Sequence, residues 1–355
     1  MESTVSERAP KGMAKVTQLA EFDAIIDARS PAEYADDHVP GAISCPVLDD
    51  EERARIGTIY KQISPFEARR AGAPLVAKNI ARHIETFFAD KPKDWKPLVY
   101  CWRGGKRSGA FCHILREIGW NAHKLEGGYK IWRQQVIADL AEWPARFSFR
   151  VISGATGSAK SRLLEALAAH GAQVLHLEAL AAHKGSVLGS LPDEPQPSQK
   201  AFETRLHSTL SALDSQLPVF VEAESRRIGS VQLPDALIAA IRSAPCLHIE
   251  ATLAARVDFL LRDYAYFLAD PHWLAEKLGH LRGLQSNETL VRWLELVDAG
   301  DFRTLVAELL AKHYDPLYQR SQAKNYRDFG DAPPLATEDL SADGITALAR
   351  RIQAA

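Results

Sequence analysis

The stretch RFSFRVISGATGSAKS, residues 146–161, decides the fold of the second half of the chain. RFSFRVIS (146–153) is an apolar run typical of a buried strand, and a helical pattern rich in Leu and Ala (161–170) follows the loop. A glycine-containing loop between a strand and a helix presents backbone N–H groups, and the positive end of the helix, to an anion. We therefore predict that residues 154–161 bind phosphate at the edge of an α/β sheet.

This loop matches the P-loop motif except at one position. We expect phosphate contacts from Gly154, Thr156, Gly157, Ser158, Ala159, Lys160 and Ser161. Lys160 would neutralise the phosphate, and the Ser161 hydroxyl would hold Mg²⁺ if the ion is present. The usual motif has glycine where this chain has Ala159, so phosphate or diphosphate binding is better supported than nucleotide hydrolysis, and the choice between ATP and GTP stays open. A purely structural glycine turn is the alternative.

Two acidic residues, Glu222 and Glu224, end the later apolar strand PVFVEAES (218–225). P-loop proteins often keep a carboxylate at this position to orient a metal, and two solvated loop acids are an equally supported interpretation. The second half continues with the strand CLHIEAT (246–252), so strands and helices alternate. This alternation predicts a P-loop NTPase-like domain with a parallel sheet.

The first half alternates in the same way. AIIDAR (24–29) and PLVYC (97–101) have strand patterns, and residues 75–90 and 109–119 have helical spacing. The pattern restarts near residue 145, after Pro144. We therefore predict a flexible N-terminus (1–15), a first α/β domain (16–144), a P-loop α/β domain (145–335) and a C-terminal helical tail (336–355).

Composition narrows the class of protein. A chain of 355 residues with 46% hydrophobic and 25% charged residues is long enough for two folded domains. The net charge of −2 gives no global basic field for nucleic acid or membranes, so RNA contacts would come from local patches. The four cysteines form no CxxC pair, which argues against zinc and disulfide frameworks. Without a signal-peptide core or a long apolar run, we expect a cytoplasmic protein without membrane association.

The loop after the strand at 97–101 carries a candidate nucleophile, Cys101. Backbone N–H groups and the start of the next helix would stabilise a thiolate or an anion there. Arg103 and Arg107 can each offer two donors to a tetrahedral oxyanion, and Gly104, Gly105 and Ser108 complete the expected anion-binding loop. A buried structural cysteine is the alternative, and it is the interpretation we favour for Cys45 and Cys112.

Three segments of the first half resemble the rhodanese family. IDARSPAEYADDHVPGAIS (26–44) is similar to its first signature and LEGGYKIW (125–132) to its second, on either side of the cysteine loop. The resemblance implies a rhodanese-like domain in which Cys101 carries a chalcogen, with Asp27 and Arg29 supporting the fold. The C-x5-R spacing is one residue longer than in simple sulfurtransferases and equals that of rhodanese-like phosphatases, which suits a phosphate-sized anion.

The fusion of a rhodanese-like domain to a P-loop domain resembles the bacterial tRNA 2-selenouridine synthases. Further similar segments are DDEERARIGTIYKQ (49–62), LEALAAHKGSVLG (177–189), PSQKAFE (197–203), VEAESRRIGSVQLP (221–234) and HYDPLYQRS (313–321). The resemblance implies that wobble 2-thiouridine in tRNA is S-geranylated by geranyl diphosphate, and that selenium from selenophosphate then replaces the S-geranyl group. We assign selenophosphate to the Cys101 loop, with Cys101 as selenium carrier, and geranyl diphosphate to residues 154–161. No tightly bound cofactor is expected.

The tRNA-binding surface is the feature that the sequence specifies least. Candidate phosphate contacts are Arg69, Arg70, Lys78 and Arg82 in the basic stretch 66–83, and Arg226 and Arg227 near the second sheet. Trp102 and Tyr129 could stack a splayed base. Solvated helix surface explains the first basic stretch equally well, and Trp102 could instead pack the loop.

Without the second resemblance, other functions stay open. The main alternative is a generic rhodanese-type sulfurtransferase with a nucleotide-binding regulatory domain. A phosphatase using the C-x5-R loop and a non-catalytic anion sensor are further possibilities, although sensing requires no thiol. The sequence leaves the oligomeric state, the choice of tRNAs and the host's supply of selenophosphate open.

Overall fold

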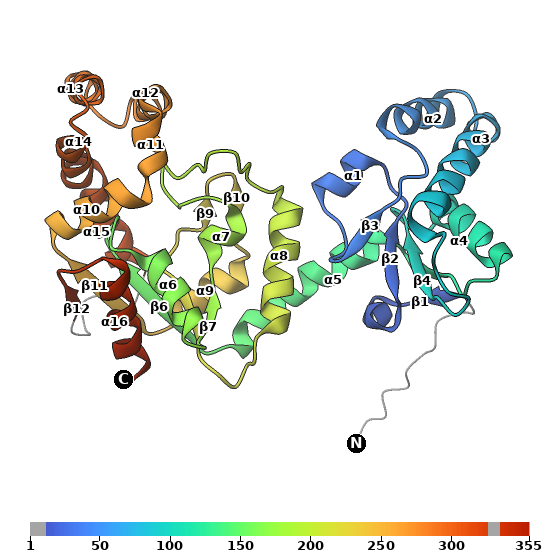
Figure 1. Ribbon diagram of the computed structural model, residues 1–355, viewed down its shortest axis with the longest axis horizontal. Helices are drawn as coiled ribbons and strands as arrows, with labels where there is room; N and C mark the ends of the chain where they lie inside the picture. The colour runs from blue at the N-terminus through green and yellow to red at the C-terminus, as the bar shows by residue number, and fades with distance from the viewer. Residues whose placement is uncertain (1–11, 326–333, 355) are drawn as a thin grey trace. The chain divides into compact units, whose positions relative to one another are not determined.

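Each half of the chain builds its own five-stranded sheet in the computed structural model (Figure 1). The structure describes residues 12–325 and 334–354. The chain divides into two compact units between Asp139 and Leu140, inside helix α5 (Tyr129–Glu142) and a few residues before the boundary expected at residue 145. Of the segment 1–15, predicted to be flexible, residues 1–11 lie outside the described residues, and Met13–Ala14 form strand β1.

The first unit contains a parallel sheet with the strand order β1-β5-β4-β2-β3. Its strands after β1 are β2 (Ala24–Asp27), β3 (Ala42–Ser44), β4 (Pro97–Tyr100) and β5 (His123–Leu125). The helices are the 3₁₀ helix η1 (Val16–Glu21), α1 (Pro31–Asp36), α2 (Asp50–Gln62), α3 (Pro65–His83), the π turn η2 (Ile84–Phe88), α4 (Lys106–Ile118) and α5. All four residues of β4 are buried, as expected for a central parallel strand covered on both faces.

Helix α3 begins well before the helix predicted at 75–90. The Ser64 side chain caps it by accepting a hydrogen bond from the Glu67 N–H, and Pro65 occupies the first turn, where its missing N–H costs nothing. Pro74 lies inside the helix without ending it. The basic stretch 66–83 is therefore helical along its whole length.

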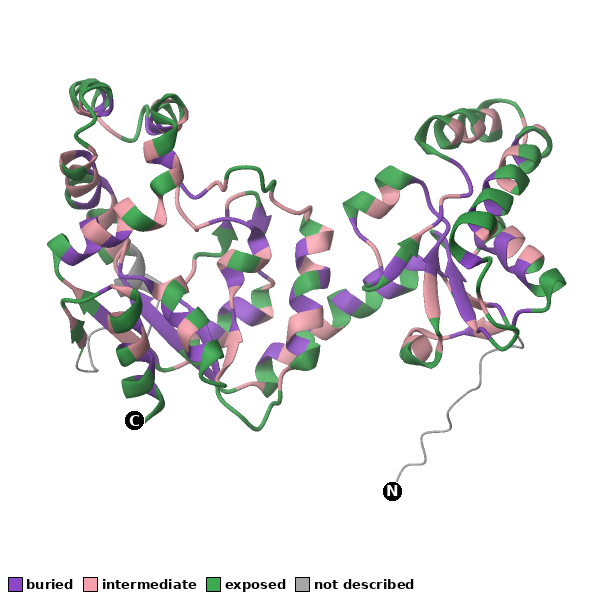
Figure 2. Ribbon diagram, viewed as in Figure 1, coloured by how far each residue is buried: buried purple, intermediate pink, exposed green. Residues whose placement is uncertain are grey.

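The second unit has a parallel sheet with the order β12-β11-β6-β8-β7, which confirms the predicted pair of parallel-sheet α/β domains. Its strands are β6 (Phe149–Gly154), β7 (Gln173–Leu175), β8 (Val219–Glu222), β11 (Cys246–Ala251) and β12 (Leu335–Thr337), and β9 (Arg227–Ile228) pairs with β10 (Val231–Gln232) in a separate antiparallel hairpin. The helices are η3 (Trp143–Arg146), α6 (Lys160–Ala169), α7 (Leu177–Ala181), α8 (Gln199–Ala212), α9 (Asp235–Ser243), α10 (Leu253–Asp263), α11 (Ala265–Ala269), α12 (Pro271–Gly279), α13 (Asn287–Asp298), α14 (Phe302–Leu309), the π turn η4 (Leu310–Tyr314), α15 (Asp315–Asn325) and α16 (Ala342–Gln353). The buried residues of Figure 2 concentrate on the strands of both sheets.

The C-terminal segment is part of the core of the second unit and not a separate tail. Strand β12 extends the sheet beside β11. Helix α16 buries Ile345, Leu348, Ala349 and Ile352 in the cluster that also holds Leu163 of α6. The i, i+3, i+4, i+7 spacing of these four residues is that of an amphipathic helix packed on a core.

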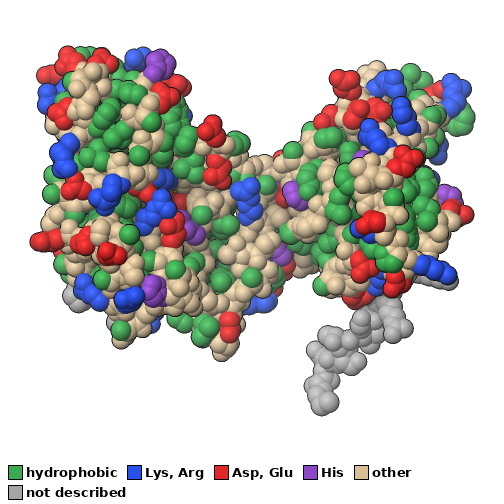
Figure 3. Space-filling model, in the orientation of Figure 1, with side chains coloured by type: hydrophobic (Ala, Val, Ile, Leu, Met, Phe, Trp, Pro, Cys, Tyr) green, Lys and Arg blue, Asp and Glu red, His purple; other side chains and the backbone are tan. Residues whose placement is uncertain are grey.

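Helices α11 to α14, together with Leu188 from the segment after α7, form a second hydrophobic cluster around the fully buried Trp293. No strand of the described residues contributes to this cluster, so the alternation of strands and helices in the sequence did not predict it. No helix within the described residues is both long and apolar enough to span a membrane. On the face shown in Figure 3, basic and acidic side chains are interspersed over both units, in agreement with the net charge of −2.

Candidate active site

The Cys101 loop connects β4 to α4. Cys101 directly follows the strand and is 3% exposed, and its Sγ lies 3.2 Å from the Oγ of buried Ser108 in the first turn of α4. Gly105 is the N-cap of that helix. The structure therefore places Cys101 and Ser108 together beside the helix N-terminus, where an anion or a thiolate is favoured.

The segment LEGGYKIW supports this loop through its backbone. Tyr129 N–H donates to the Cys101 carbonyl at 2.9 Å, and Lys130 N–H donates to the Trp102 carbonyl at 3.0 Å. Gly128 has φ +61°, and a Cβ there would lie 2.2 Å from the Cys101 carbonyl oxygen and 2.4 Å from the Gly104 nitrogen. A side chain at position 128 would thus push the loop away, so this close approach requires glycine.

The two loop arginines differ in their surroundings. Arg107 does not simply point its donors at an oxyanion: Nη1 and Nη2 pair with the two carboxylate oxygens of Glu33 at 2.5 and 3.1 Å. Burial would raise the pKa of Glu33, but the hydrogen bond and charge of Arg107 hold it below its usual range. Arg103 is exposed, and no carboxylate in the described part of the chain pairs with it. Arg103 is therefore the arginine whose charge is available to an anion.

Arg29 supports the fold beneath the loop, as the resemblance implied. Its guanidinium pairs with Asp27 at 2.6 Å and lies 3.8 Å from the centre of the Tyr129 ring. The Tyr129 hydroxyl donates to Asp37 at 2.7 Å, and the residue is buried. Tyr129 is therefore unavailable for stacking a base, which corrects that expectation. Trp102, which is 39% exposed, retains an accessible ring.

The other two cysteines of the first unit behave as structural residues. Burial, with the charge of Asp27, raises the pKa of Cys45 to about 12. Burial also raises the pKa of Cys112 to about 11. Both side chains stay protonated thiols at neutral pH, so neither is a nucleophile.

The P-loop connects β6 to α6. Lys160 Nζ donates to the Gly154 carbonyl at 2.8 Å, which folds the lysine back across the loop. Ala159 is buried and has φ 60° and ψ 27°, the left-handed conformation that glycine adopts more easily. The departure from the usual motif therefore changes the residue type while the backbone keeps a glycine-like shape. A Cβ at Gly157, which has φ +82°, would lie 2.8 Å from Leu260.

An arginine from α10 donates a hydrogen bond to the backbone of the P-loop. Arg256 Nε donates to the Thr156 carbonyl at 2.8 Å, and its guanidinium pairs with Asp315 at 2.6 Å. Arg256 is buried, whereas Asp315 is partly exposed. The contact with Thr156 restrains the backbone of the P-loop.

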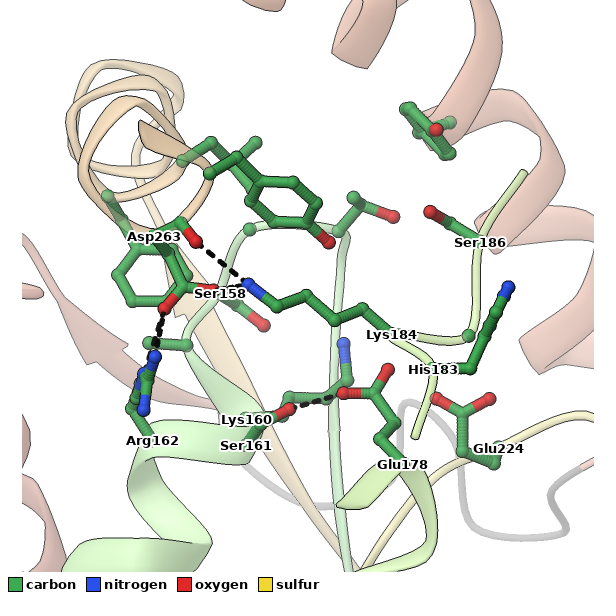
Figure 4. A pocket seen from close by; sticks show the side chains of 18 of the residues that line it. Ser158, Lys160, Ser161, Arg162, Glu178, His183, Lys184, Ser186, Glu224 and Asp263 are labelled. Atoms are coloured by element: carbon green, nitrogen blue, oxygen red, sulfur yellow. Dashed lines mark hydrogen bonds and ion pairs between the residues drawn. The ribbon is translucent and has the colours of Figure 1, made fainter. Parts of the chain in front are cut away.

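A cavity of about 610 Å³ opens at the P-loop (Figure 4). Ser161 Oγ donates to Glu178 at 2.6 Å, and Lys184 Nζ donates to Asp263 at 2.6 Å. Glu224 also lines the cavity, and Figure 4 shows its carboxylate beside His183. The cavity thus combines cationic groups, which suit a phosphate, with carboxylates, which suit a cation.

The carboxylates at the end of β8 are not solvated loop acids. Glu222 is fully buried and accepts hydrogen bonds from the Glu178 N–H at 2.7 Å and from His176 Nδ1 at 3.1 Å. Burial and the charge of Glu222 raise the pKa of Glu178. Burial, with the charges of Glu178 and Glu222, raises the pKa of Glu224 well above its usual value. A cation beside Ser161 would relieve this repulsion, although no group of three metal-binding side chains occurs among the described residues.

Comparison with known proteins identifies the family. The family model described as tRNA 2-selenouridine synthase AAA domain matches residues 147–290, and the rhodanese-like domain model matches residues 12–135. The tRNA 2-selenouridine synthase of Aeromonas salmonicida is 32% identical over 323 residues, covering 83% of this chain and 86% of that protein. The chain belongs to the tRNA 2-selenouridine synthase family.

Coverage of the other relatives varies across this family. The tRNA 2-selenouridine synthase of Nitrosomonas europaea is 37% identical over 244 residues, covering 68% of this chain. The chain spans 63% of the length of that protein. Among solved structures, the N-terminal domain of a Clostridium difficile 630 protein is 34% identical, with a TM-score of 0.32, and covers 35% of this chain and 98% of that one.

The four basic residues of α3 predicted to contact tRNA do not all share one face of the helix. Arg69, Arg70, Lys78 and Arg82 are all exposed on α3. Lys78 and Arg82, four positions apart, share a face, whereas Arg69 lies on a different side of the helix. Arg70 pairs with Glu67 at 2.6 Å, Arg226 pairs with Asp235, and Arg227 donates to the Gly229 carbonyl at 2.7 Å.

Several site residues escaped the motif analysis. Glu178, His183 and Lys184 lie in the segment 177–189, which the family resemblance had singled out without assigning roles. Arg256 and Asp263 carried no local signal, because only the packing of α10 brings them to the P-loop.

Proposed function

We propose that this chain is an enzyme that converts wobble 2-thiouridine of tRNA into 2-selenouridine in two steps, in the cytoplasm. Family membership and the presence of two anion-binding loops on one chain support the proposal. Each loop takes one anionic donor: geranyl diphosphate at the P-loop and selenophosphate at the Cys101 loop. No tightly bound organic cofactor is required.

The first step is S-geranylation. The thiocarbonyl sulfur attacks C1 of geranyl diphosphate, so a C–S bond forms, the C–O bond to diphosphate breaks, and the uridine loses its N3 proton. Lys160 and the P-loop N–H groups stabilise the charge on the leaving diphosphate. If Mg²⁺ binds, Ser161 and Glu178 would hold it, and the ion would neutralise further diphosphate charge.

The second step exchanges sulfur for selenium. The selenium of selenophosphate bonds to C2, and the C2–S bond breaks with release of geranyl thiol, a better leaving group than the sulfur of the thiocarbonyl. Water then cleaves the P–Se bond, leaving phosphate and 2-selenouridine, with no change in oxidation state. Because selenium passes directly to C2 in this step, Cys101 is not a covalent selenium carrier here. Its thiol, beside Ser108, positions the selenium end of selenophosphate, and Arg103 supplies the charge that Arg107 shares with Glu33.

The P-loop cavity is the observation that carries the proposal. It combines Lys160 with Ser161 and a carboxylate in a space of about 610 Å³, large enough for a diphosphate and an organic group. A rhodanese-type sulfurtransferase reaction has no second anionic donor to place in such a site.

Mass spectrometry of nucleosides tests both steps. Thiolated tRNA is incubated with the protein and both donors, with each donor omitted in turn. Geranylated nucleoside without selenophosphate, and selenouridine with both donors, are expected. Thiosulfate turnover with no change in the tRNA would instead support the sulfurtransferase.

Two variants assign the loops. Lys160→Ala should lose geranylation but keep selenation of pre-geranylated tRNA, whereas exposed Lys312→Ala should keep both. Cys101→Ser should lose selenation but keep geranylation, with Cys112→Ser as the buried-thiol control. Normal selenation by Cys101→Ser would remove the cysteine from the proposal.

A further inference from the structure

A small apolar pocket lies beside the P-loop cavity, between α10, α11 and α14. It has a volume of about 70 Å³. Its walls include Phe267, Leu274, Leu305 and Leu309, each at most 5% exposed, which belong to the hydrophobic cluster around Trp293. The hydrophobic core of the helical region therefore forms part of the walls of the pocket.

The pocket and the P-loop cavity adjoin. Five residues line both: Thr156, Ser186, Leu260, Tyr264 and Tyr314. Thr156 belongs to the P-loop itself, and Leu260 is the side chain that packs closest to Gly157. A ligand whose phosphate occupies the P-loop can thus extend directly into apolar surroundings.

The polar groups of the pocket lie at this junction and not in its interior. Beyond Thr156, Ser186, Tyr264 and Tyr314, the lining consists of aliphatic side chains and phenylalanine. The Tyr314 hydroxyl is already hydrogen-bonded to Ser186 and to the Leu188 backbone. A nucleotide base would find no partners for its ring nitrogens and exocyclic groups, and burying them unpaired is costly. An unfunctionalised hydrocarbon has no such cost.

The size of the pocket limits what enters it. A protein cavity that binds benzene measures roughly 150 Å³, about twice this volume. The pocket therefore takes the branched tip of a terminal five-carbon unit, while the rest of the chain stays in the larger cavity. One face of α14 forms a wall of the small pocket, with lining residues at i, i+3, i+4 and i+7: Phe302, Leu305, Val306 and Leu309.

We infer that this pocket is the subsite for the terminal isoprene unit of the prenyl diphosphate, and that α14 sets the preferred chain length. The inference rests on the proposed function, because the hydrocarbon is that of its prenyl donor. Val306 is the position to change, because it lines the pocket but is only partly buried, so a substitution there disturbs folding less than one at Leu305.

Substrate competition tests the inference with the full-length protein. Rates of S-prenylation of thiolated tRNA are compared for dimethylallyl, geranyl and farnesyl diphosphates. Val306→Phe fills the pocket and should lower kcat/KM for geranyl diphosphate at least tenfold, because each buried methylene contributes roughly fourfold in binding. The kcat/KM for dimethylallyl diphosphate should stay within about twofold of the wild-type value. Val306→Ala should raise the farnesyl to geranyl ratio. Val291→Phe, on the exposed face of α13, is the matched control and should behave as wild type.

Direct binding separates this inference from the proposed function. Calorimetry without tRNA should show tighter binding of geranyl diphosphate than of inorganic diphosphate, with a more negative heat-capacity change, and Val306→Phe should reduce both differences. If that pattern holds but no tRNA is modified, the proposed function fails and the pocket assignment stands. Equal binding of the two ligands, an equal effect of Val306→Phe on all three donors, or loss of ATP or GTP binding in Val306→Phe would overturn the assignment.

Discussion

Replacement of Gly128 by alanine tests how the Cys101 loop is held. The new Cβ would lie 2.2 Å from the Cys101 carbonyl oxygen and 2.4 Å from the Gly104 nitrogen. Both atoms belong to the backbone, so the loop and the start of α5 must separate. We expect the separation to break the hydrogen bonds from the N–H groups of Tyr129 and Lys130 to this loop.

The expected cost has two parts. An L-residue at φ +61° costs about 1–2 kcal/mol, and two lost backbone hydrogen bonds cost about 1 kcal/mol each. Gly128→Ala should therefore lower the free energy of unfolding of the first unit by about 3–4 kcal/mol. Gly41→Ala is the matched control, because Gly41 has φ +75° with no atom within 4 Å of the added Cβ, so only the conformational cost of about 1–2 kcal/mol applies.

Cysteine labelling in urea measures each unit separately. Cys45 is buried in the first unit and Cys246 in the second, so peptide mass spectrometry of their modification reports the two unfolding transitions in one sample. Only the Cys45 transition should move in Gly128→Ala. Equal losses of stability in Gly128→Ala and Gly41→Ala, within about 0.5 kcal/mol, would refute the close approach as the reason for glycine.

Three further changes test the second unit. Burial would lower the pKa of His176, but the hydrogen bond and charge of Glu222 raise it above 6.5. The stability that the protonated His176 provides is therefore complete below pH 6.5 and is lost as the pH rises through the raised pKa. Labelling of Cys246 in urea should show this loss as the pH rises above 6.5 in the wild type and not in His176→Asn; equal pH dependence would contradict it. Ala159→Gly relieves about 1–2 kcal/mol of left-handed strain but removes a buried methyl worth about 0.8 kcal/mol, so the same assay should show a gain of at most about 1 kcal/mol. A loss above about 2 kcal/mol would be inconsistent with the observed backbone. Glu224→Gln removes a carboxylate that a cation would stabilise. In calorimetry, Mg²⁺ with diphosphate should therefore raise the Tm of the wild type more than that of the variant. Equal shifts would exclude this carboxylate from the cation site.

Local sequence determined both parallel-sheet domains and the position of both loops predicted to bind anions. Strand, loop and helix are contiguous in each case, so the hydrophobic period and the glycines of a single stretch specify the geometry around Cys101 and Lys160. The glycines of the second rhodanese-like signature were recognisable for the same reason, although only the structure shows that Gly128 touches the Cys101 loop.

Tertiary packing decided what surrounds those loops. Glu33 pairs with Arg107, and Glu178 accepts a hydrogen bond from Ser161, because separate elements meet at the carboxyl ends of the parallel strands. No local sequence pattern encodes these contacts. The apolar pocket likewise exists only where α10 and α14 pack against each other beside Thr156. Local periodicity determines which face of a helix a residue occupies. Its partners across a cavity depend on how elements that are distant in the sequence pack together. The sequence by itself therefore located the two loops predicted to bind anions, and the tertiary structure decided which charged and apolar side chains surround them.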